Sequence, residues 1–191
     1  MRVVIIGQSW LATKTLESLI NIGIKPIAAL PDKSDRFADT ASGLAIPIIA
    51  DPKNLPECDI AIAAHCHRYI PPEILNRPRH GVVAYHPSLL PRHRGRDAVH
   101  WTIAMKDPIA GGSVYVMDDG VDTGEIVLQD WCHVLPNDTP QTLWRRELGP
   151  LGVKLLTQST KILFKTSMLR TTKQDVRATT WEPALSRQKL R

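Results

Sequence analysis

The chain has 191 residues, of which 43% are hydrophobic and 23% charged, and it carries a net charge of +5. This composition is typical of a folded globular protein and excludes a long disordered chain. No apolar run reaches the ~20 residues that cross a bilayer, so the sequence predicts no membrane span. The three cysteines, Cys58, Cys66 and Cys132, form no Cys-x-x-Cys pair. We therefore expect reduced thiols in a cytoplasmic protein.

The excess positive charge lies at the end of the chain. Residues 1–164 hold 17 basic and 17 acidic side chains, whereas residues 165–191 hold seven basic and two acidic ones. A groove that binds nucleic acid needs a basic face on the folded body. The sequence therefore disfavours a nucleic-acid partner. It divides the chain into a domain over residues 1–164 and a basic extension over residues 165–191 that packs on the domain or trails from it.

The first third of the chain predicts short apolar strands that alternate with helices. Residues 3–6 are apolar and β-branched and end at Gly7, where the chain must turn, and Ser9 is placed to cap the helix that follows. We also expect extended segments at 26–30, 46–49 and 59–64 and a helix at 34–44. Continuously apolar strands in this alternation are typical of a parallel sheet. The predicted fold is α/β, a Rossmann-like, open and mostly parallel sheet with helices on both faces.

The remaining elements follow a proline-rich loop. A strand at 81–85 leads into the loop at 86–95, and Asp97 is placed to cap a helix that ends near Met105. Two further strands are expected at 112–117 and 125–134. A long amphipathic helix begins at Thr139, and Gly149-Pro150 predicts a kink in it.

Two ligand classes are disfavoured by the loops that follow the strands. The turn Gly7-Gln8-Ser9-Trp10 has one glycine where a dinucleotide fingerprint needs three, and Trp10 fills the space of a pyrophosphate. The sequence therefore predicts no nicotinamide cofactor. His65 and His67 alternate along one strand end, but no third ligand lies nearby in the sequence, so we predict no metal site.

Two other loops carry residues suited to proton chemistry. His86 falls at the end of its strand, and Asp118, Asp119 and Asp122 share a short turn with two glycines. Ligands of open parallel sheets bind beyond the carboxyl ends of the strands, where these loops meet. The residues alone leave two interpretations open, a catalytic histidine with an acidic partner, or a solvated turn beside a capped histidine.

The two loops resemble those of the folate-dependent formyltransferases, the family of the glycinamide ribonucleotide and methionyl-tRNA formyltransferase catalytic domains. The resemblance rests on a His-Pro-Ser-Leu-Leu-Pro loop at 86–91 and an Asp-Gly-x-Asp-Thr-Gly turn at 119–124, with 36 positions between His86 and Asp122. Within the family, the segments 66–71, 78–81 and 85–95 are most similar to the hydrolase domain of 10-formyltetrahydrofolate dehydrogenase. The resemblance implies a formyltransferase fold with its catalytic domain in residues 1–164.

The resemblance also implies a chemistry and a set of site residues. The formyl donor would be 10-formyltetrahydrofolate, and no metal is needed. His86 would donate to the oxyanion and move a proton, and Asp122 would orient it or the attacking group. The folate-binding positions implied by the family are Cys66, His67, Arg68, Tyr69, Ile70, Ser88, Leu89, Asp118, Asp119, Gly120 and Val121. Arg92, Arg94 and Arg96 would face the folate glutamates or an anionic acceptor, or form an exposed basic loop.

One position departs from the family pattern. The transferases usually have an asparagine two residues before the histidine, where this chain has Ala84. Losing one oxyanion donor typically costs ~2.7–4 kcal/mol of transition-state stabilisation. Ala84 therefore implies a modest rate or another donor, such as a backbone N–H or a water molecule.

The acceptor stays open between several small molecules. Trp10 disfavours glycinamide ribonucleotide, and residues 165–191 are too few for the barrel domain of the tRNA-modifying members. The leading prediction is transfer to a small-molecule amine, an amino sugar nucleotide among the candidates. The first alternative is that water is the acceptor, which would make the protein a 10-formyltetrahydrofolate hydrolase. The second alternative is a folate-binding module without catalytic activity. The sequence leaves the oligomeric state open, with a dimer as one candidate.

Overall fold

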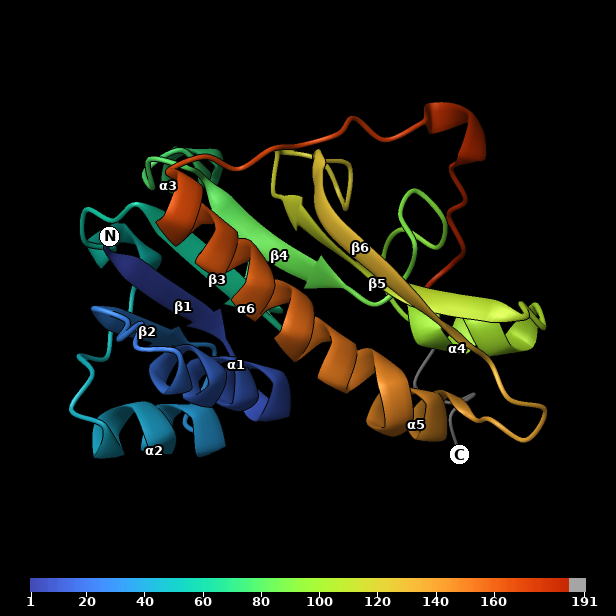
Figure 1. Ribbon diagram of the computed structural model, residues 1–191, viewed down its shortest axis with the longest axis horizontal. Helices are drawn as coiled ribbons and strands as arrows, with labels where there is room; N and C mark the ends of the chain where they lie inside the picture. Colours follow the sequence, from blue (N-terminus) through green and yellow to red (C-terminus); the bar gives the residue numbers. More distant parts are fainter. Residues whose placement is uncertain (186–191) are drawn as a thin grey trace.

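A six-stranded sheet forms the centre of the computed structural model, which describes residues 1–185 (Figure 1). The strand order is β2-β1-β3-β4-β5-β6; the first four strands are parallel, and β5 and β6 are antiparallel to their neighbours. The bounds are β1 (Val3–Gly7), β2 (Ala28–Pro31), β3 (Ile60–Ala64), β4 (Val82–His86), β5 (Ile109–Val116) and β6 (Ile126–His133). The predicted α/β, mostly parallel sheet is confirmed.

The helices surround this sheet unevenly. They are α1 (Ser9–Asn21), α2 (Arg36–Gly43), α3 (Pro72–Leu75), α4 (Ala98–Ala104), α5 (Pro140–Leu143) and α6 (Gly149–Thr166), with short helical segments η1 (Pro52–Asn54), η2 (Trp144–Leu148) and η3 (Val176–Ala178). The longest two, α1 and α6, lie side by side on one face of the sheet (Figure 1). Within residues 1–185 no helix has both the length and the apolar character needed to cross a membrane.

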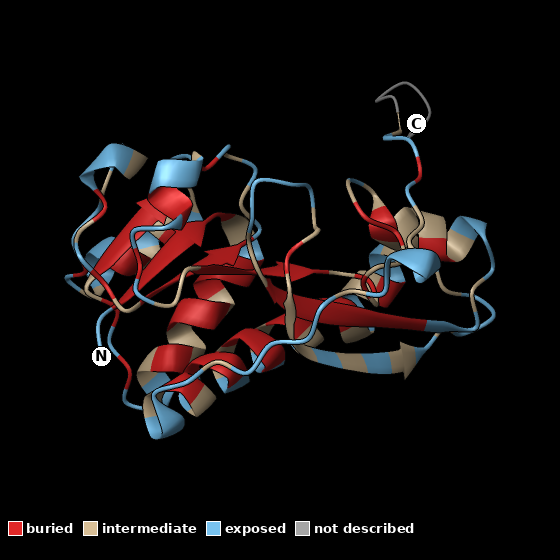
Figure 2. Cartoon of the chain, turned by 90° about the horizontal axis from the view of Figure 1, so that it is seen from above, coloured by how far each residue is buried: buried red, intermediate tan, exposed pale blue. Residues whose placement is uncertain are grey.

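The alternation of side chains along β1 explains the two layers of the core. Val3 and Ile5 pack in the cluster that includes α1 and α6, whereas Val4 and Ile6 pack in the cluster that includes α3. All four side chains are fully buried, because both faces of the strand are covered. The central strands are accordingly buried, and β6 at the sheet edge is only partly covered (Figure 2).

A close backbone approach fixes the turn after β1. Gly7 has a φ of +143°, and a Cβ placed there would lie 1.9 Å from the carbonyl oxygen of Ala64. Only glycine fits between these two backbones. The start of α1 is thereby held against the end of β3, at the carboxyl edge of the sheet.

Two predicted helix caps are wrong. The residue before α1 is Gln8, not Ser9, and the backbone N–H of Ser9 donates to the Asp35 carboxylate at 2.6 Å. Asp97 precedes α4 in a left-handed conformation, with a φ of 66°, and its side chain makes no cap. Its carboxylate instead accepts from the backbone N–H of Leu185 at 3.0 Å. In both cases a distant segment provides a partner that local spacing does not show.

Two other expected elements differ from the structure. Residues 46–49 make only an isolated bridge, Ile48 with Ala29, because Pro47 has no N–H with which to extend a ladder. The long helix is interrupted before Gly149-Pro150, at the π-helical segment η2. The predicted interruption therefore lies a few residues earlier, and Pro150 occupies the first turn of α6, where its missing N–H is tolerated.

The residues that follow α6 run back across the sheet. Residues 167–185 are mostly exposed and contain no strand, but Thr172 bridges to Ile126 at the sheet edge and Trp181 bridges to Arg94. Figure 1 shows this segment passing above the sheet from the end of α6 to the region of α4. The predicted extension begins within α6, and its positions 186–191 lie outside the described residues.

Candidate active site

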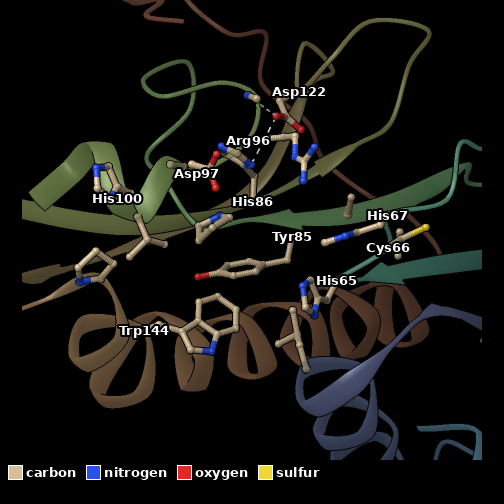
Figure 3. Close-up of a pocket in the computed structure, with 18 of the residues that line it drawn as sticks. His65, Cys66, His67, Tyr85, His86, Arg96, Asp97, His100, Asp122 and Trp144 are labelled. Carbon is tan, nitrogen blue, oxygen red and sulfur yellow. Dashed lines mark hydrogen bonds and ion pairs between the residues drawn. The ribbon is translucent and has the colours of Figure 1, made fainter. Parts of the chain in front are cut away.

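A cavity of about 1380 Å³ opens at the carboxyl ends of the parallel strands (Figure 3). Its wall includes Ala63 from β3 and Ala84 and His86 from β4. Trp10 at the start of α1 and Trp144 in η2 lie on another part of the wall. The sheet therefore places the predicted histidine inside a pocket large enough for a small-molecule ligand.

The two ring nitrogens of His86 have different partners. Nε2 lies 2.6 Å from the backbone oxygen of His93, and Nδ1 lies 3.5 Å from Oδ2 of Asp122. A carbonyl oxygen only accepts, so Nε2 carries the hydrogen in this contact. Nδ1, on the side of Asp122, is then the nitrogen that can take up or release a proton. The ring is only 7% exposed, which fixes its orientation.

Asp122 is held by three contacts around its own backbone and carboxylate. Oδ1 accepts from the Tyr115 hydroxyl at 2.6 Å, and Oδ2 accepts from the backbone N–H of Gly95 at 2.7 Å. The backbone oxygen of Asp122 accepts from Nε2 of Gln174 at 2.9 Å. Because the residue has a φ of 54°, these contacts hold the backbone in a left-handed conformation that is unfavourable for a side-chain-bearing residue.

Tyr115 was not predicted from the sequence as a site residue. It lies on β5 directly opposite Ala84 and is 5% exposed. Burial, together with the neighbouring Asp122 carboxylate, raises the pKa of Tyr115 well above its ordinary value, so the phenol remains a donor to that carboxylate. A tyrosine on an apolar strand has the same sequence signature as an ordinary core residue, so no local signal marked it.

The first predicted folate-binding segment is divided by the structure. Cys66 and His67 line the cavity (Figure 3), and the backbone N–H of His67 donates to Asp32 at 2.7 Å. Arg68 instead donates to the backbone oxygens of Ala50 and Pro31 and does not line the cavity. The two residues that follow point to opposite environments, since Tyr69 is 77% exposed and Ile70 is buried in the core.

Two ionisable groups of this segment stay neutral near physiological pH. Burial and the Asp32 carboxylate raise the pKa of the Cys66 thiol to about 12, which keeps it protonated and a poor nucleophile. Burial, with a contribution from His67, lowers the pKa of His65. His65 and His67 form an edge-to-face pair, and no group of three potential metal ligands occurs among residues 1–185.

The predicted residues Ser88 and Leu89 lie within the loop at 86–95 and do not line the main cavity. The Ser88 hydroxyl donates to the backbone oxygen of Arg92 at 2.6 Å, and the Ser88 carbonyl accepts from Ser113. Leu89 packs against Gly111 of β5, where a Cβ would lie 2.6 Å from the leucine side chain. These contacts shape the loop that follows His86.

Only some residues of the acidic turn line the cavity. Val121 lines the cavity next to Asp122, whereas Asp118 closes the turn by accepting from the Gly120 backbone and the Thr123 hydroxyl. Asp119 and Gly120 are exposed and outside the cavity lining.

Ala84 lies in the cavity wall with no polar atom on its side chain, and it is 7% exposed. The basic loop nearby is mostly occupied by protein partners: Arg92 pairs with Asp107, and Arg94 donates to Gln174. Arg96 lines the cavity. Several further lining residues were missed by the sequence analysis because they come together only in three dimensions: Trp10, His100, Trp144, Arg145 and Leu185.

Comparison with known proteins decides the family. A family model described as formyl transferase matches residues 40–158, more than half of the chain. The chain belongs to the formyl transferase family. This confirms the resemblance noted in the sequence, and the family consists of enzymes that transfer formyl groups or hydrolyse formyltetrahydrofolate.

Several members of the formyl transferase family are similar to this chain in sequence or in fold. The cytosolic 10-formyltetrahydrofolate dehydrogenase of Xenopus laevis is 34% identical over 203 residues, which cover 96% of this chain and 22% of that protein. The phosphoribosylglycinamide formyltransferase of Bacillus halodurans has a TM-score of 0.77 at 22% identity, covering 88% of this chain and 97% of that one. A sugar 3N-formyltransferase studied with dTDP and 5-N-formyl-THF has a TM-score of 0.83 at 18% identity, covering 100% and 71%. This chain thus spans about a fifth of the length of the first of these relatives.

Proposed function

We propose that this formyl transferase domain transfers the formyl group of 10-formyltetrahydrofolate to a small-molecule amine, with His86 and Asp122 carrying the proton chemistry. The observation that carries the proposal is the His86 ring, fixed through Nε2 on a backbone carbonyl with Nδ1 facing the Asp122 carboxylate in the cavity. The catalytic domain is residues 1–164, and residues 165–191 are an extension of it.

The contacts of His86 fit the demands of acyl transfer. Attack of an amine on the formyl carbon produces an oxyanion, and the leaving N10 of the folate must gain a proton. In the protonated ring, Nε2 keeps its hydrogen bond to the His93 carbonyl while Nδ1–H donates to the oxyanion or to Asp122. The fixed Asp122 carboxylate stabilises that cation and accepts the proton lost by the amine. His86 passes its Nδ1 proton to N10 as the bond between N10 and the formyl carbon breaks, and the proton on Asp122 then replaces it, so that one proton leaves the amine and one reaches N10.

The apolar part of the cavity suits the folate. Ala63, Met117 and Val121 provide apolar wall next to the polar backbone that follows β3. A flat pterin needs such walls together with a few backbone donors and acceptors. We propose that the pterin lies between the Cys66-His67 segment and the turn at Asp122.

The remaining part of the cavity favours an organic acceptor over water alone. The cavity volume of about 1380 Å³ exceeds the ~300–1000 Å³ of a typical single-ligand pocket. The cavity wall also carries the rings of Trp10 and Trp144 and the cations Arg96 and Arg145. Aromatic rings and guanidinium groups bind planar rings and phosphates, so an amino sugar nucleotide is the acceptor class that fits.

A specific observation favours hydrolysis as a second candidate. The Ala84 side chain offers no hydrogen bond to an oxyanion in the cavity. A water molecule beside Ala84 would supply that donor and would also stand ready as a nucleophile. The domain would then release formate from 10-formyltetrahydrofolate without an amine.

Product analysis separates these functions. The protein is incubated with 10-formyltetrahydrofolate, with and without a panel of amines that includes amino sugar nucleotides, and tetrahydrofolate, formate and formylated amine are measured. We expect amine-dependent turnover that falls at least ~100-fold in His86→Ala, whereas His133→Ala, an exposed histidine on β6, serves as a control that keeps the rate. Turnover without amine would support the hydrolase.

Two results of this experiment contradict the enzyme. Tight binding of the folate without turnover on any acceptor would make the domain a folate-binding module. Turnover that is unaffected by His86→Ala would leave the reaction in place but overturn the proposed mechanism.

The oxidation state of the cysteines indicates in which compartment of the cell the domain resides. All three cysteines are free, although Cys58 is buried and Cys66 is largely covered. We place the domain in the cytoplasm, where reduced thiols persist. The Xenopus laevis relative named above is called cytosolic, which agrees with this proposal.

A further inference from the structure

The segment from Gln174 to Glu182, called the strap below, contacts both loops that carry the proposed catalytic pair. We propose that Gln174, Thr180 and Glu182 are positioning residues: the strap orients the His93 carbonyl that holds His86 and the backbone that holds Asp122. The inference rests on the proposed function, since it assumes that His86 and Asp122 take part in the reaction.

The first contact of the strap is with a buried histidine. His93 is 3% exposed, and its ring lies between two carboxylates: Nε2 is 2.8 Å from Oδ2 of Asp107, and Nδ1 is 3.1 Å from Oε2 of Glu182. The Glu182 contact is an ion-pair distance without hydrogen-bond alignment. With a carboxylate on each side, the ring has one favoured orientation.

The backbone of His93 connects this ring to His86. Its N–H donates to the Thr180 hydroxyl at 2.8 Å, and its carbonyl oxygen accepts from Nε2 of His86 at 2.6 Å. The residue has a φ of 53°, a left-handed conformation that persists in a residue other than glycine only when its surroundings hold it. The strap provides two of the groups that hold it, Thr180 and Glu182.

The second contact of the strap is with the acidic turn. Nε2 of Gln174 donates to the backbone oxygens of Asp122 at 2.9 Å and Gly124 at 2.7 Å. Its Oε1 accepts from the Arg94 guanidinium at 3.1 and 2.6 Å. One amide side chain thus links the loop after β4 to the turn that presents Asp122 to His86.

The burial of Glu182 indicates that the strap does more than cover the sheet edge. Its side chain is 8% exposed, although most of residues 167–185 are exposed (Figure 2). Removing a carboxylate from water is unfavourable unless charged partners compensate it. Nδ1 of the His93 ring lies 3.1 Å from this carboxylate, and the backbone of His93 contacts the proposed catalytic histidine.

The test compares three variants of the full chain. Glu182→Gln keeps the shape of the side chain and removes its charge, Gln174→Ala removes the link to Asp122, and Asp175→Asn is the matched control. Asp175 lies in the same strap but is exposed and pairs with Arg177. We expect kcat to fall ~10–100-fold in the first two variants, while KM for the folate changes less than ~2-fold, because misplaced groups slow the chemical step more than binding. Asp175→Asn should retain the kcat of the unaltered protein.

A second readout does not depend on turnover. Nitrogen NMR of the His86 ring reports which nitrogen carries the hydrogen, and we expect Nε2–H in the unaltered protein and a mixture of tautomers in Glu182→Gln. Unchanged kcat and an unchanged His86 spectrum in both strap variants would overturn the inference. If the unaltered protein has no activity, the proposed function fails, and the NMR comparison still decides whether the strap orients His86. Should Glu182→Gln fail to fold, Gln174→Ala carries the kinetic test.

Discussion

Tyr115 on β5 and Ala84 on β4 lie directly opposite each other in the sheet. One of them is a strong donor, but it is used by Asp122 at 2.6 Å, and the other has no donor at all. Residue 84 therefore provides no side-chain amide to the cavity wall, so an oxyanion formed beside it would need another donor, such as Nδ1–H of His86, a backbone N–H or a water molecule. Ala84 is the position at which the sequence departs from the asparagine that the family resemblance implies.

Restoring the amide at this position should increase the rate of transfer. In Ala84→Asn the new side chain is expected to extend into the cavity and donate to the developing oxyanion. One such donor typically increases kcat by ~100–1000-fold. The measurement is kcat for formyl transfer to the best amine found. Ala84→Leu, which fills similar volume without a donor, is the control. Equal rates in both variants would show that space, and not hydrogen bonding, matters at residue 84.

The sequence predicted the principal site residues but not their supporting contacts. His86 and Asp122 were predicted because the two loops around them resemble loops of the formyltransferases, and the structure places Nδ1 of His86 3.5 Å from Oδ2 of Asp122. Their role in catalysis stays a prediction. Tyr115 and His93 could not be predicted, since their importance depends on contacts with residues that only the folded sheet brings near. For Arg68 the family resemblance implied a folate contact, whereas its guanidinium donates to the backbone oxygens of Ala50 and of Pro31 at the end of β2.

At the scale of elements, the interrupted helix shapes the cavity. Segment η2 has π-helical geometry and contributes Trp144 and Arg145 to the wall. It is tied to the sheet because the Tyr85 hydroxyl donates to the Leu148 backbone oxygen at 2.7 Å, in a buried position. π-Helical segments often occur at functional sites, where they project a side chain that a regular helix would turn away.

Loss of this hydrogen bond should weaken the fold. Tyr85→Phe removes the donor and leaves the buried carbonyl of Leu148 with one partner fewer, so we expect the free energy of unfolding to fall by about 1 kcal/mol. Urea unfolding measures the change. The exposed Tyr69→Phe is the control and should leave the midpoint in place. A midpoint for Tyr85→Phe equal to that of the control would show that the bond adds no net stability.

The strands were predictable from the sequence, whereas the helix ends were less so. Apolar runs identified β1, β3 and β4 because both of their faces are buried, which is a local property of composition. The caps were predicted wrongly at Ser9 and Asp97, since their polar groups bind Asp35 and Leu185 instead. Local spacing identifies a residue that can cap, and tertiary contacts decide whether it does.

At the scale of the whole molecule, residues 165–185, the described part of the basic extension, pack on the domain. The chain after α6 returns to the region of the cavity, where the backbones of Arg94 and Trp181 form an isolated bridge and the Trp101 indole donates to the Pro183 backbone. The boundary at residue 164, drawn from charge alone, therefore falls within one packed structure. Composition indicates where charge is concentrated, but it does not show which surface the charged segment covers.

Folate binding should stabilise the whole domain. A ligand that binds only the folded state adds about 2.7 kcal/mol at 100 times its Kd, which for a chain of this size raises Tm by about 5–10 °C. Thermal unfolding with unreactive 5-formyltetrahydrofolate measures this. Val121→Asp places a charge on the proposed pterin wall and should abolish the shift, whereas Val176→Asp, at an exposed site outside the cavity lining, should not. Equal increases in Tm in both variants would show that the pterin does not bind beside Val121.

The direction of β1 has a practical consequence. Because the strand runs from Val3 towards the cavity at Ser9, Met1 lies at the opposite edge of the sheet, roughly 15 Å away along the strand, and is 46% exposed (Figure 1). Leu185, by contrast, lines the cavity itself. Affinity handles, dyes or sensor surfaces are therefore best attached beside Met1, which leaves the cavity open to solvent.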